Sequence, residues 1–240
     1  MTGGPGQVLR ISVIVPCFNA EAYIGEALDS ALAQSHSPHE IIVIDDGSTD
    51  QSARVISNQF GSRVRYHHQT NKGIGSARNA GVRLADGNCI AFLDADDLWP
   101  QDSLGVRIAH LGETPAIHCV YGRTLAFVSP ELEPAICAGL YCPSEAQAGR
   151  AAGAMLLRKP IFDQIGYFDE TLRLGETLDW VARFDEQGFS ALAIEDIVLR
   201  RRIHMANTTI RERGQQSDYL KLIKASLDRR RAQGPSTPAE

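Results

Sequence analysis

Short runs of β-branched residues alternate with helical patterns through the first hundred residues, and this alternation limits the chain to few folds. Ile11–Pro16 and Glu40–Ile44 are apolar runs of strand length, and each is followed by a segment with apolar residues at helical spacing. Val64–His68 and Cys89–Leu93 are expected to be the third and fourth strands, with a helix of small residues over Gly75–Ala85 between them. Strands separated by helices build βαβ units around a buried sheet. The sequence therefore predicts an α/β fold with a central, mostly parallel sheet flanked by helices.

The second half of the chain has a weaker pattern. The expected elements there are helices over Asp102–Leu111, Leu178–Gln187 and Tyr219–Arg231, strands over His118–Val128 and Ala191–Leu199, and a short apolar segment at Ala154–Leu157. Pro130–Arg150 contains three prolines and is expected to form a loop or lid. Because no repeat or Gly/Ser-rich linker divides the chain, we expect one domain over residues 9–231, between a flexible N-terminus (1–8) and a disordered tail (232–240).

Composition excludes several classes of protein. The chain is 43% hydrophobic and 22% charged, as in ordinary globular domains, and its net charge of −5 gives no basic field for nucleic acid. Its apolar runs are far shorter than the roughly 18 residues of a membrane span, and Met1–Gln7 has no signal-peptide pattern. The five cysteines include no C-x-x-C pair, and Cys137 and Cys142 lack partners at zinc spacing. These features predict a cytoplasmic protein with reduced cysteines.

Two acidic clusters follow expected strands directly. Asp45–Asp50 (DDGSTD) follows the second strand and Asp94–Asp97 (DADD) follows the fourth, so both should face one crevice at the carboxyl ends of the strands. Three carboxylates within four residues repel one another unless a cation neutralises them, and oxygen ligands favour Mg²⁺ or Mn²⁺. A D-x-D at a strand end suits a metal–diphosphate. The alternative is that Asp97 caps the turn before Trp99, and that the first cluster is also only a turn and helix cap.

Asn71–Asn79 (NKGIGSARN) superficially resembles a dinucleotide-binding fingerprint. Arg78 stands where the third glycine belongs, and the segment does not directly follow the first strand, so we exclude a dinucleotide-dependent dehydrogenase. The glycines, the expected helix N-terminus, Lys72 and Arg78 still suit an anionic ligand. The alternative for Lys72 is a solvated surface position.

These motifs in this order resemble the family 2 inverting glycosyltransferases. The matching segments are SVIVPCFNAEAYIGEALDSALAQS, EIIVIDDGSTD, NKGIGSARNAG and CIAFLDADDLWP, which together cover about residues 11–100. GYFDETLRLGETLDWVARFDEQG and RRRIHMAN match more loosely. The resemblance implies the Rossmann-like GT-A fold of nucleotide-diphospho-sugar transferases, with a nucleotide-sugar-binding half over residues 9–100 and a smaller acceptor half over residues 101–231.

The resemblance also implies roles for individual residues. The implied nucleotide-sugar-binding residues are Pro16, Asn19, Glu21, Asp46, Arg78, Asp94 and Ala95. Asp46 would hydrogen-bond the base, Arg78 would approach the base or the diphosphate, and Asp94 would contact the ribose. Asp96 would bind a metal ion, Mn²⁺ or Mg²⁺, that bridges the two phosphates. Such a cation neutralises the charge that develops on the departing nucleoside diphosphate.

Inversion also requires a carboxylate that deprotonates the acceptor hydroxyl. The family usually supplies it from a Glu-Asp pair that opens a late helix, but in Gly175–Trp180 (GETLDW) Thr177 stands at the expected Asp position. Glu176 and Asp179 are the remaining candidates. We favour Asp179 slightly, because Trp180 beside it could shape an acceptor or sugar pocket. The alternative is that Asp179 only places negative charge in the first turn of a helix.

The late segment adds a possible metal ligand and a basic region. His204 and Asn207 form an H-x-x-N, and in related enzymes a late His completes the metal shell, although a structural histidine is an equal alternative. Trp99 is expected in the core. Arg200–Arg231 contains eight Arg and two Lys, which could bind a diphosphate, a lipid-linked acceptor or the inner face of a membrane, or form a solvated helix face.

The expected function is metal-dependent transfer of a sugar from a UDP- or dTDP-sugar to an unknown hydroxyl acceptor. The Q-x-x-R-W element of processive synthases is absent, which favours one sugar per event. A sugar nucleotidyltransferase is disfavoured because Pro16–Asn19 stands where that class carries a glycine-rich loop. A nucleotide-sugar-binding protein without turnover stays open, because Thr177 replaces the expected base.

Overall fold

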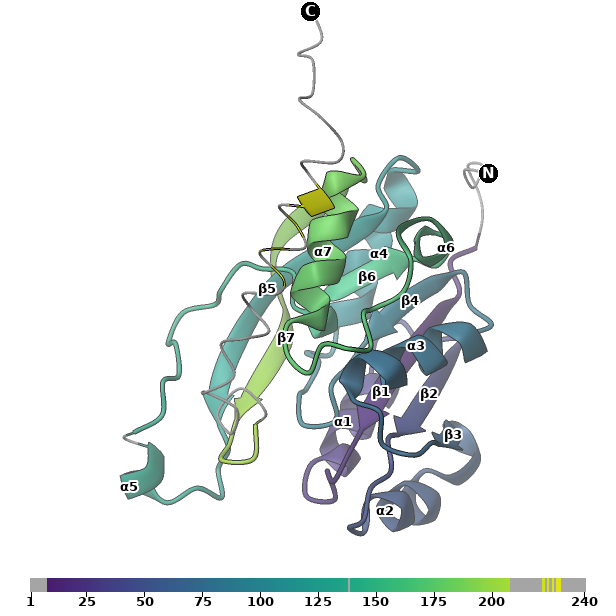
Figure 1. The fold of residues 1–240 in the computed structure, drawn as a ribbon. Helices are drawn as coiled ribbons and strands as arrows, with labels where there is room; N and C mark the ends of the chain where they lie inside the picture. Colours follow the sequence, from purple (N-terminus) through teal and green to yellow (C-terminus); the bar gives the residue numbers. More distant parts are fainter. Residues whose placement is uncertain are drawn as a thin grey trace, which may run out of the picture.

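The computed structural model describes residues 8–137 and 139–207, together with residues 222, 224, 226, 228 and 229. In this part of the chain seven strands form one sheet in the order β3-β2-β1-β4-β6-β5-β7 (Figure 1). The strands are β1 (Ile11–Cys17), β2 (Glu40–Asp45), β3 (Arg65–His68), β4 (Cys89–Phe92), β5 (Cys119–Val128), β6 (Met155–Arg158) and β7 (Ala191–Ile203). The helices are α1 (Ile24–Leu32), α2 (Ser52–Gln59), α3 (Ile74–Leu84), α4 (Ser103–Glu113), α5 (Pro134–Cys137), α6 (Ile161–Ile165) and α7 (Glu176–Glu186).

The sheet is mostly parallel, as the sequence predicts. β1 to β4 run parallel, β5 pairs in parallel with β7, and β6 is antiparallel to both β4 and β5. The chain moves from β1 outward to β3 and then returns to place β4 on the other side of β1. In open α/β sheets ligands bind where the strand order reverses, which in this sheet is at the carboxyl ends of β1 and β4.

Helices cover both faces of the sheet. The core on one face includes residues of α1, α2 and α4, and the core on the other includes residues of α3, α6 and α7, which lie in front of the sheet in Figure 1. Along β1, Val13 and Val15 pack into the first core and Ile14 into the second. Burial on both faces explains why the central strands β1, β2 and β4 are continuous apolar runs rather than alternating ones.

The second half differs from expectation in two elements. β7 continues past the expected end at Leu199 to Ile203, because it pairs with β5 as far as the Val128–Ile203 pair. The expected loop Pro130–Arg150 contains the four-residue helix α5. Most of the expected helix Tyr219–Arg231 lies outside the described residues. The pairing of β4 with β6 joins the two halves in one sheet, while the domain bounds stay predictions.

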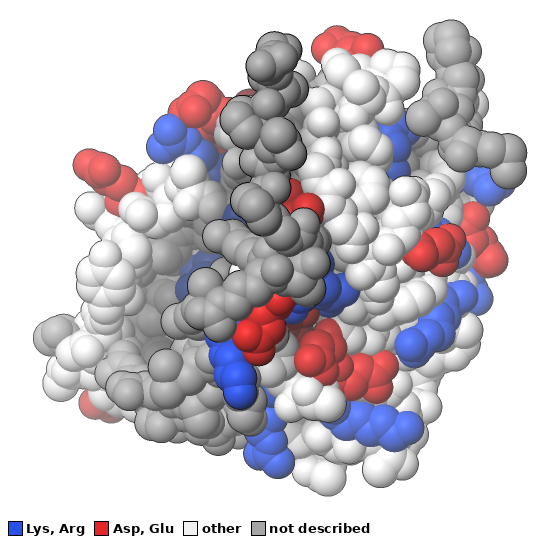
Figure 2. Space-filling model, turned by 45° about the horizontal axis from the view of Figure 1, so that its top comes forward, with Lys and Arg blue, Asp and Glu red and all other residues white. Residues whose placement is uncertain are grey.

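Two surface properties can be stated for the described residues. None of their helices combines the length and the apolar character that crossing a membrane requires. On the face drawn in Figure 2, their acidic and basic side chains lie interspersed.

Candidate functional site

Two loops at the carboxyl ends of β1 and β2 are tied together by the side chains expected to line a nucleotide pocket. Asn19, which has a positive φ of 49°, accepts a hydrogen bond from the Thr49 amide at 2.8 Å, and its own amide donates to Ser48 Oγ at 3.0 Å. Glu21 accepts from the Gln51 amide at 2.7 Å. Asn19 and Glu21 therefore fix the rim of the crevice, while Pro16 is buried within β1 just below it.

Asp46 organises the next loop. Its carboxylate accepts hydrogen bonds from the Gln69 side chain at 2.7 Å and from the amides of Lys72 and Gly73 at 2.9 and 2.8 Å. Asp46 is buried, so these contacts hold the loop before α3 in one conformation. A nucleobase N–H that donates to the Asp46 carboxylate would compete with these three donors. The expected contact of Asp46 with the base stays a prediction.

Arg78 on α3 links the two halves of the molecule. Its guanidinium is buried and donates to Asp94 Oδ1 at 2.7 Å, to Glu176 Oε1 at 2.5 Å and to Thr177 Oγ1 at 3.0 Å. Burial alone would lower the pKa of Arg78, but the negative charges of Asp94 and Glu176 outweigh it and raise that pKa. Arg78 thus bridges Asp94–Asp97, called the D-x-D segment below, to the start of α7. The sequence alone did not predict this role.

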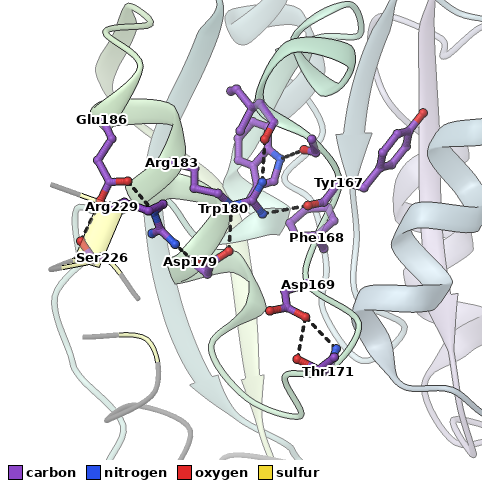
Figure 3. A network of polar contacts seen from close by, with 12 residues as sticks. Tyr167, Phe168, Asp169, Thr171, Asp179, Trp180, Arg183, Glu186, Ser226 and Arg229 are labelled. Carbon is purple, nitrogen blue, oxygen red and sulfur yellow. Dashed lines mark hydrogen bonds and ion pairs between the residues drawn. The ribbon is translucent and has the colours of Figure 1, made fainter. Parts of the chain in front are cut away.

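Asp179 lies one turn further along α7 in a separate ionic network (Figure 3). Its Oδ2 accepts from Arg183 Nε at 2.8 Å, and its Oδ1 accepts from Arg229 Nη1 at 3.2 Å. Arg229 also binds Glu186, and Arg183 donates to the carbonyl oxygen of Tyr167 at 2.8 Å. Both oxygens of Asp179 are therefore engaged by guanidinium groups, whereas Glu176 shares a cluster with the D-x-D segment.

Both tryptophans of the chain lie in the interior. The expectation that Trp180 shapes a sugar pocket is wrong, because Trp180 is fully buried, packs on Phe162 with ring centroids 5.0 Å apart, and donates to the Gly166 carbonyl. Trp99 is also buried, and its indole donates to the Gly153 carbonyl oxygen at 2.9 Å, which confirms its expected place in the core.

The D-x-D segment meets the end of β7. Asp96 Oδ2 lies 2.9 Å from His204 Nε2 and 3.2 Å from Asn207 Nδ2. Asp97 is buried and accepts the Arg202 amide at 2.9 Å, so the alternative that it caps a local turn is wrong. Burial raises the pKa of Asp97 well above its usual range, and the charges of Asp96 and Asp94 add to that rise. Ala95 between them is nearly buried.

The side chains of Asp96 and His204 fit a divalent cation that is shared with a bound diphosphate. A carboxylate oxygen and an imidazole nitrogen converge from segments 108 residues apart, and Nδ1 of His204 is buried without a hydrogen-bond partner in the described structure. Among the described residues, no group of three or more His, Cys, Asp or Glu could hold a metal by itself. Mg²⁺ and similar cations commonly take one or two protein ligands and fill the remaining positions with substrate phosphates and water. Asp96 and His204 suit that arrangement.

Sequence reasoning missed Arg202, whose amide and side chain both contact the D-x-D segment. It is the third of three consecutive arginines, and a charge run gives no direct sign of which member is buried. The available signal was its position two residues before His204, since alternate residues of a strand share a face.

Comparison with curated proteins identifies relatives that are glycosyltransferases. Residues 12–136 match the glycosyl transferase family 2 model. The chain is 44% identical over 109 residues to an uncharacterized glycosyltransferase of Nostoc sp. (44% of this chain, 34% of that protein). It is 37% identical over 117 residues to chondroitin synthase of Escherichia coli (48% and 17%). An uncharacterized glycosyltransferase of Rickettsia typhi is 28% identical over 226 residues (87% and 69%). The matched region thus spans only 17% and 34% of the length of two of the most similar relatives, from Rickettsia felis and Nostoc sp..

Solved structures share the fold. Staphylococcus aureus TarS 1–349 in complex with UDP-GlcNAc superposes with a TM-score of 0.73 at 20% identity, over 91% of this chain and 65% of that chain. The mannosyltransferase PcManGT of Pyrobaculum calidifontis in complex with GDP-Man and Mn²⁺ gives a TM-score of 0.68 at 18% identity, over 98% and 67%. At this identity the likeness shows the fold alone. Together with the family match, it shows that the chain belongs to glycosyl transferase family 2 and has the GT-A fold.

Proposed function

We propose that this chain is a metal-dependent, inverting glycosyltransferase that transfers one sugar at a time from a nucleoside-diphosphate sugar to a hydroxyl acceptor. The observation that carries the proposal is the pairing of Asp96 with His204 beside the crevice of a GT-A fold. The solved neighbours support such a donor and a divalent cation, since they contain UDP, UDP-GlcNAc or GDP-Man with Mn²⁺. The donor is a UDP- or dTDP-sugar, with a GDP-sugar as the alternative.

In this proposal Asp96 and His204 would hold Mn²⁺ or Mg²⁺, and Asp94 would contact the ribose. The bound cation would neutralise the charge that develops on the departing diphosphate. The rim loops fixed by Asn19 and Glu21, and the loop fixed by Asp46, shape the base pocket. Their hydrogen bonds support this role, because a preorganised pocket loses less entropy when it binds its ligand.

The contacts of the two candidate bases favour Glu176 over Asp179, which reverses the preference from the sequence. Each Asp179 oxygen already accepts from an arginine of a structural network, so Asp179 anchors α7. Glu176 also accepts from an arginine, Arg78, but its contacts in the described structure are made by Oε1 alone. Arg78 joins it to Asp94, which is the side chain assigned to the ribose. Glu176 would accept the proton of the acceptor hydroxyl. The oxygen of that hydroxyl would form a bond to the anomeric carbon of the donor sugar while the bond from this carbon to the diphosphate breaks.

We further propose that residues 9–231 form one domain, with nucleotide-sugar binding in residues 9–100 and acceptor binding in residues 101–231. The β4–β6 pairing and the buried Arg78–Glu176 ion pair support this arrangement, because each connects the two halves. The acceptor, including a lipid-linked one, would bind to residues 101–231.

Turnover with a panel of donors tests the proposal. Release of UDP from UDP-GlcNAc or of GDP from GDP-Man would be measured with and without Mn²⁺, first with water and then with sugar acceptors. Glu176→Gln should lower kcat by about 100-fold or more, the usual size of general-base catalysis, and should change the donor KM little. Asp179→Asn should lower the free energy of unfolding and leave kcat close to the wild-type value. Wild-type turnover in the Glu176→Gln variant, with turnover lost in Asp179→Asn, would return the base to Asp179.

A nucleotide-sugar-binding protein without turnover is the second candidate, and Thr177 at the expected base position favours it. Such a protein would bind UDP with Mn²⁺ but release no diphosphate from any donor in the panel. The same assay therefore separates the two functions.

A further inference from the structure

Arg202 holds the D-x-D segment from behind. Its amide donates to Asp97 Oδ1, and its Nε donates to the carbonyl oxygen of Asp96, both at 2.9 Å. The remaining guanidinium nitrogens donate to Ser129 Oγ at 3.2 Å and to Glu26 Oε2 at 2.6 Å. Since Arg202 is only 2% exposed, this one side chain ties together β7, the D-x-D segment, α1 and the end of β5.

The direction of these hydrogen bonds is what suits a cation site. Arg202 binds the backbone of Asp96 and leaves the Asp96 carboxylate facing His204. A guanidinium bonded to the carboxylate itself would compete with a metal ion for the same oxygens. The ion pair with Glu26 offsets the positive charge of Arg202, which reduces its repulsion of a nearby cation.

Tyr23 connects Arg202 to the second expected ligand. Its ring packs against the His204 imidazole, with centroids 4.4 Å apart, and the Arg202 guanidinium lies 5.0 Å from the same ring. The Tyr23 hydroxyl is itself fixed by a 2.6 Å hydrogen bond to Glu131. Arg202 and Tyr23 together therefore restrict the position of His204 as well as that of Asp96.

We propose that Arg202 is a positioning residue that fixes Asp96 and His204 at the spacing a divalent cation requires. This inference rests on the proposed function, in which those two side chains hold the cation. Groups that orient metal ligands from outside the coordination shell typically change metal affinity by about 10- to 100-fold when they are removed. Lysine cannot replace Arg202, because it lacks the planar fork that reaches several acceptors at once.

Mn²⁺ affinity in the presence of UDP tests the proposal on the full chain. Free Mn²⁺ would be followed by electron paramagnetic resonance for the wild type, Arg202→Met, Arg202→Lys and Asp96→Asn, with metal-free UDP affinity measured in parallel. Both Arg202 variants should bind Mn²⁺ about 10- to 100-fold more weakly. Their metal-free UDP affinity should stay within about twofold of the wild type, since Arg202 has no expected contact with the nucleotide.

Arg107→Met is the matched control for lost packing. Arg107 is also a fully buried arginine, bonded to the carbonyl oxygens of Ser103 and Met155 and stacked 4.8 Å from the Trp99 ring. Its loss should lower the melting temperature without changing Mn²⁺ affinity. Equal Mn²⁺ affinity in the wild type and both Arg202 variants would overturn the proposal, as would an equal loss in Arg107→Met.

Two further comparisons keep the test decisive. If Arg202→Met does not fold, Glu26→Ala replaces it, because the Glu26 side chain is 61% exposed and its truncation removes one acceptor of Arg202 without leaving a buried cavity. Weaker Mn²⁺ binding in that variant supports the proposal, and unchanged binding overturns it. Wild-type Mn²⁺ affinity in Asp96→Asn would refute the metal site itself, and the role of Arg202 with it. If Mn²⁺ affinity falls only in Asp96→Asn, the metal site stands and only the positioning role of Arg202 is refuted.

Discussion

Replacing Arg78 by methionine tests the link between the two halves of the molecule. The side chains of Arg78 and Glu176 are only 3% and 10% exposed, so the variant leaves a buried carboxylate without its cation. Breaking a buried ion pair on one side costs about 3–5 kcal/mol. Asp94, the second partner, is 33% exposed, and water can replace part of that interaction. We therefore expect a loss near the lower end, about 3 kcal/mol of unfolding free energy.

Urea and thermal unfolding measure this loss. For a domain of this size about 3 kcal/mol corresponds to a fall in melting temperature of roughly 6–12 °C. Arg83→Met on the same helix is the control, because the Arg83–Glu170 pair is exposed at 54% and 41% with a 3.7 Å separation. An exposed pair of that kind contributes about 0–1 kcal/mol.

A double-mutant cycle with Glu176→Gln assigns the effect to the pair. Arg78→Met and Glu176→Gln should together cost less than the sum of the single changes, with a coupling of about 1–3 kcal/mol. Additive losses, or a loss in Arg78→Met no greater than in Arg83→Met, would refute the bridging role of Arg78.

Three further predictions concern other residues of the site. Hydrogen bonds from the Ser129 and Tyr23 hydroxyls lower the pKa of Glu131 to about 2. The ionised Glu131 therefore stabilises the folded chain above about pH 4.3, the ordinary glutamate pKa, and this contribution is lost as the pH falls toward 2. Glu131→Gln should flatten that part of the stability–pH curve, and an unchanged slope would contradict this. Trp180→Phe should lower the melting temperature and leave the donor KM unchanged, whereas a raised KM at unchanged stability would place the ring in a binding pocket. Thr177→Asp adds a carboxylate beside a buried ion pair, so unfolding free energy should fall with no gain in turnover, and a large gain would show that the wild type lacks a base.

Much of the fold follows from local patterns in the sequence. Three of the four strands of the first half, β1, β2 and β4, are apolar runs, and helices on both faces of the sheet bury them, so pattern and packing agree. The fourth, β3, is a polar strand (RYHH) at the edge of the sheet and is only partly buried. Gly47, in the acidic segment Asp45–Asp50, has a φ of +78° in the turn after β2. A Cβ at Gly47 would lie 2.8 Å from the Asn71 amide, so the turn also needs glycine for close approach.

The site was predicted less completely, because its geometry depends on partners far apart in the sequence. Arg78 meets Glu176 across 98 residues, and no local spacing indicates that contact. The same limit applies to Asp179, whose engagement by Arg229 comes from a segment 50 residues later. β7 extends past Leu199 because long-range pairing and a buried arginine outweigh the low strand tendency of three consecutive charges.

Thermal stability with nucleotides shows directly whether Asp96 and His204 form a metal–diphosphate site. UDP and GDP would each be added at about 100 times the dissociation constant, with and without Mn²⁺, to the wild type and to Asp96→Asn. Saturation at that level adds about 2.7 kcal/mol, or roughly 5–11 °C, if the folded chain alone binds the ligand. We expect such a rise for one nucleoside diphosphate with Mn²⁺ in the wild type, and a much smaller rise in Asp96→Asn. Equal rises in the two proteins, or no rise with either nucleotide, would contradict a metal–diphosphate site at Asp96 and His204.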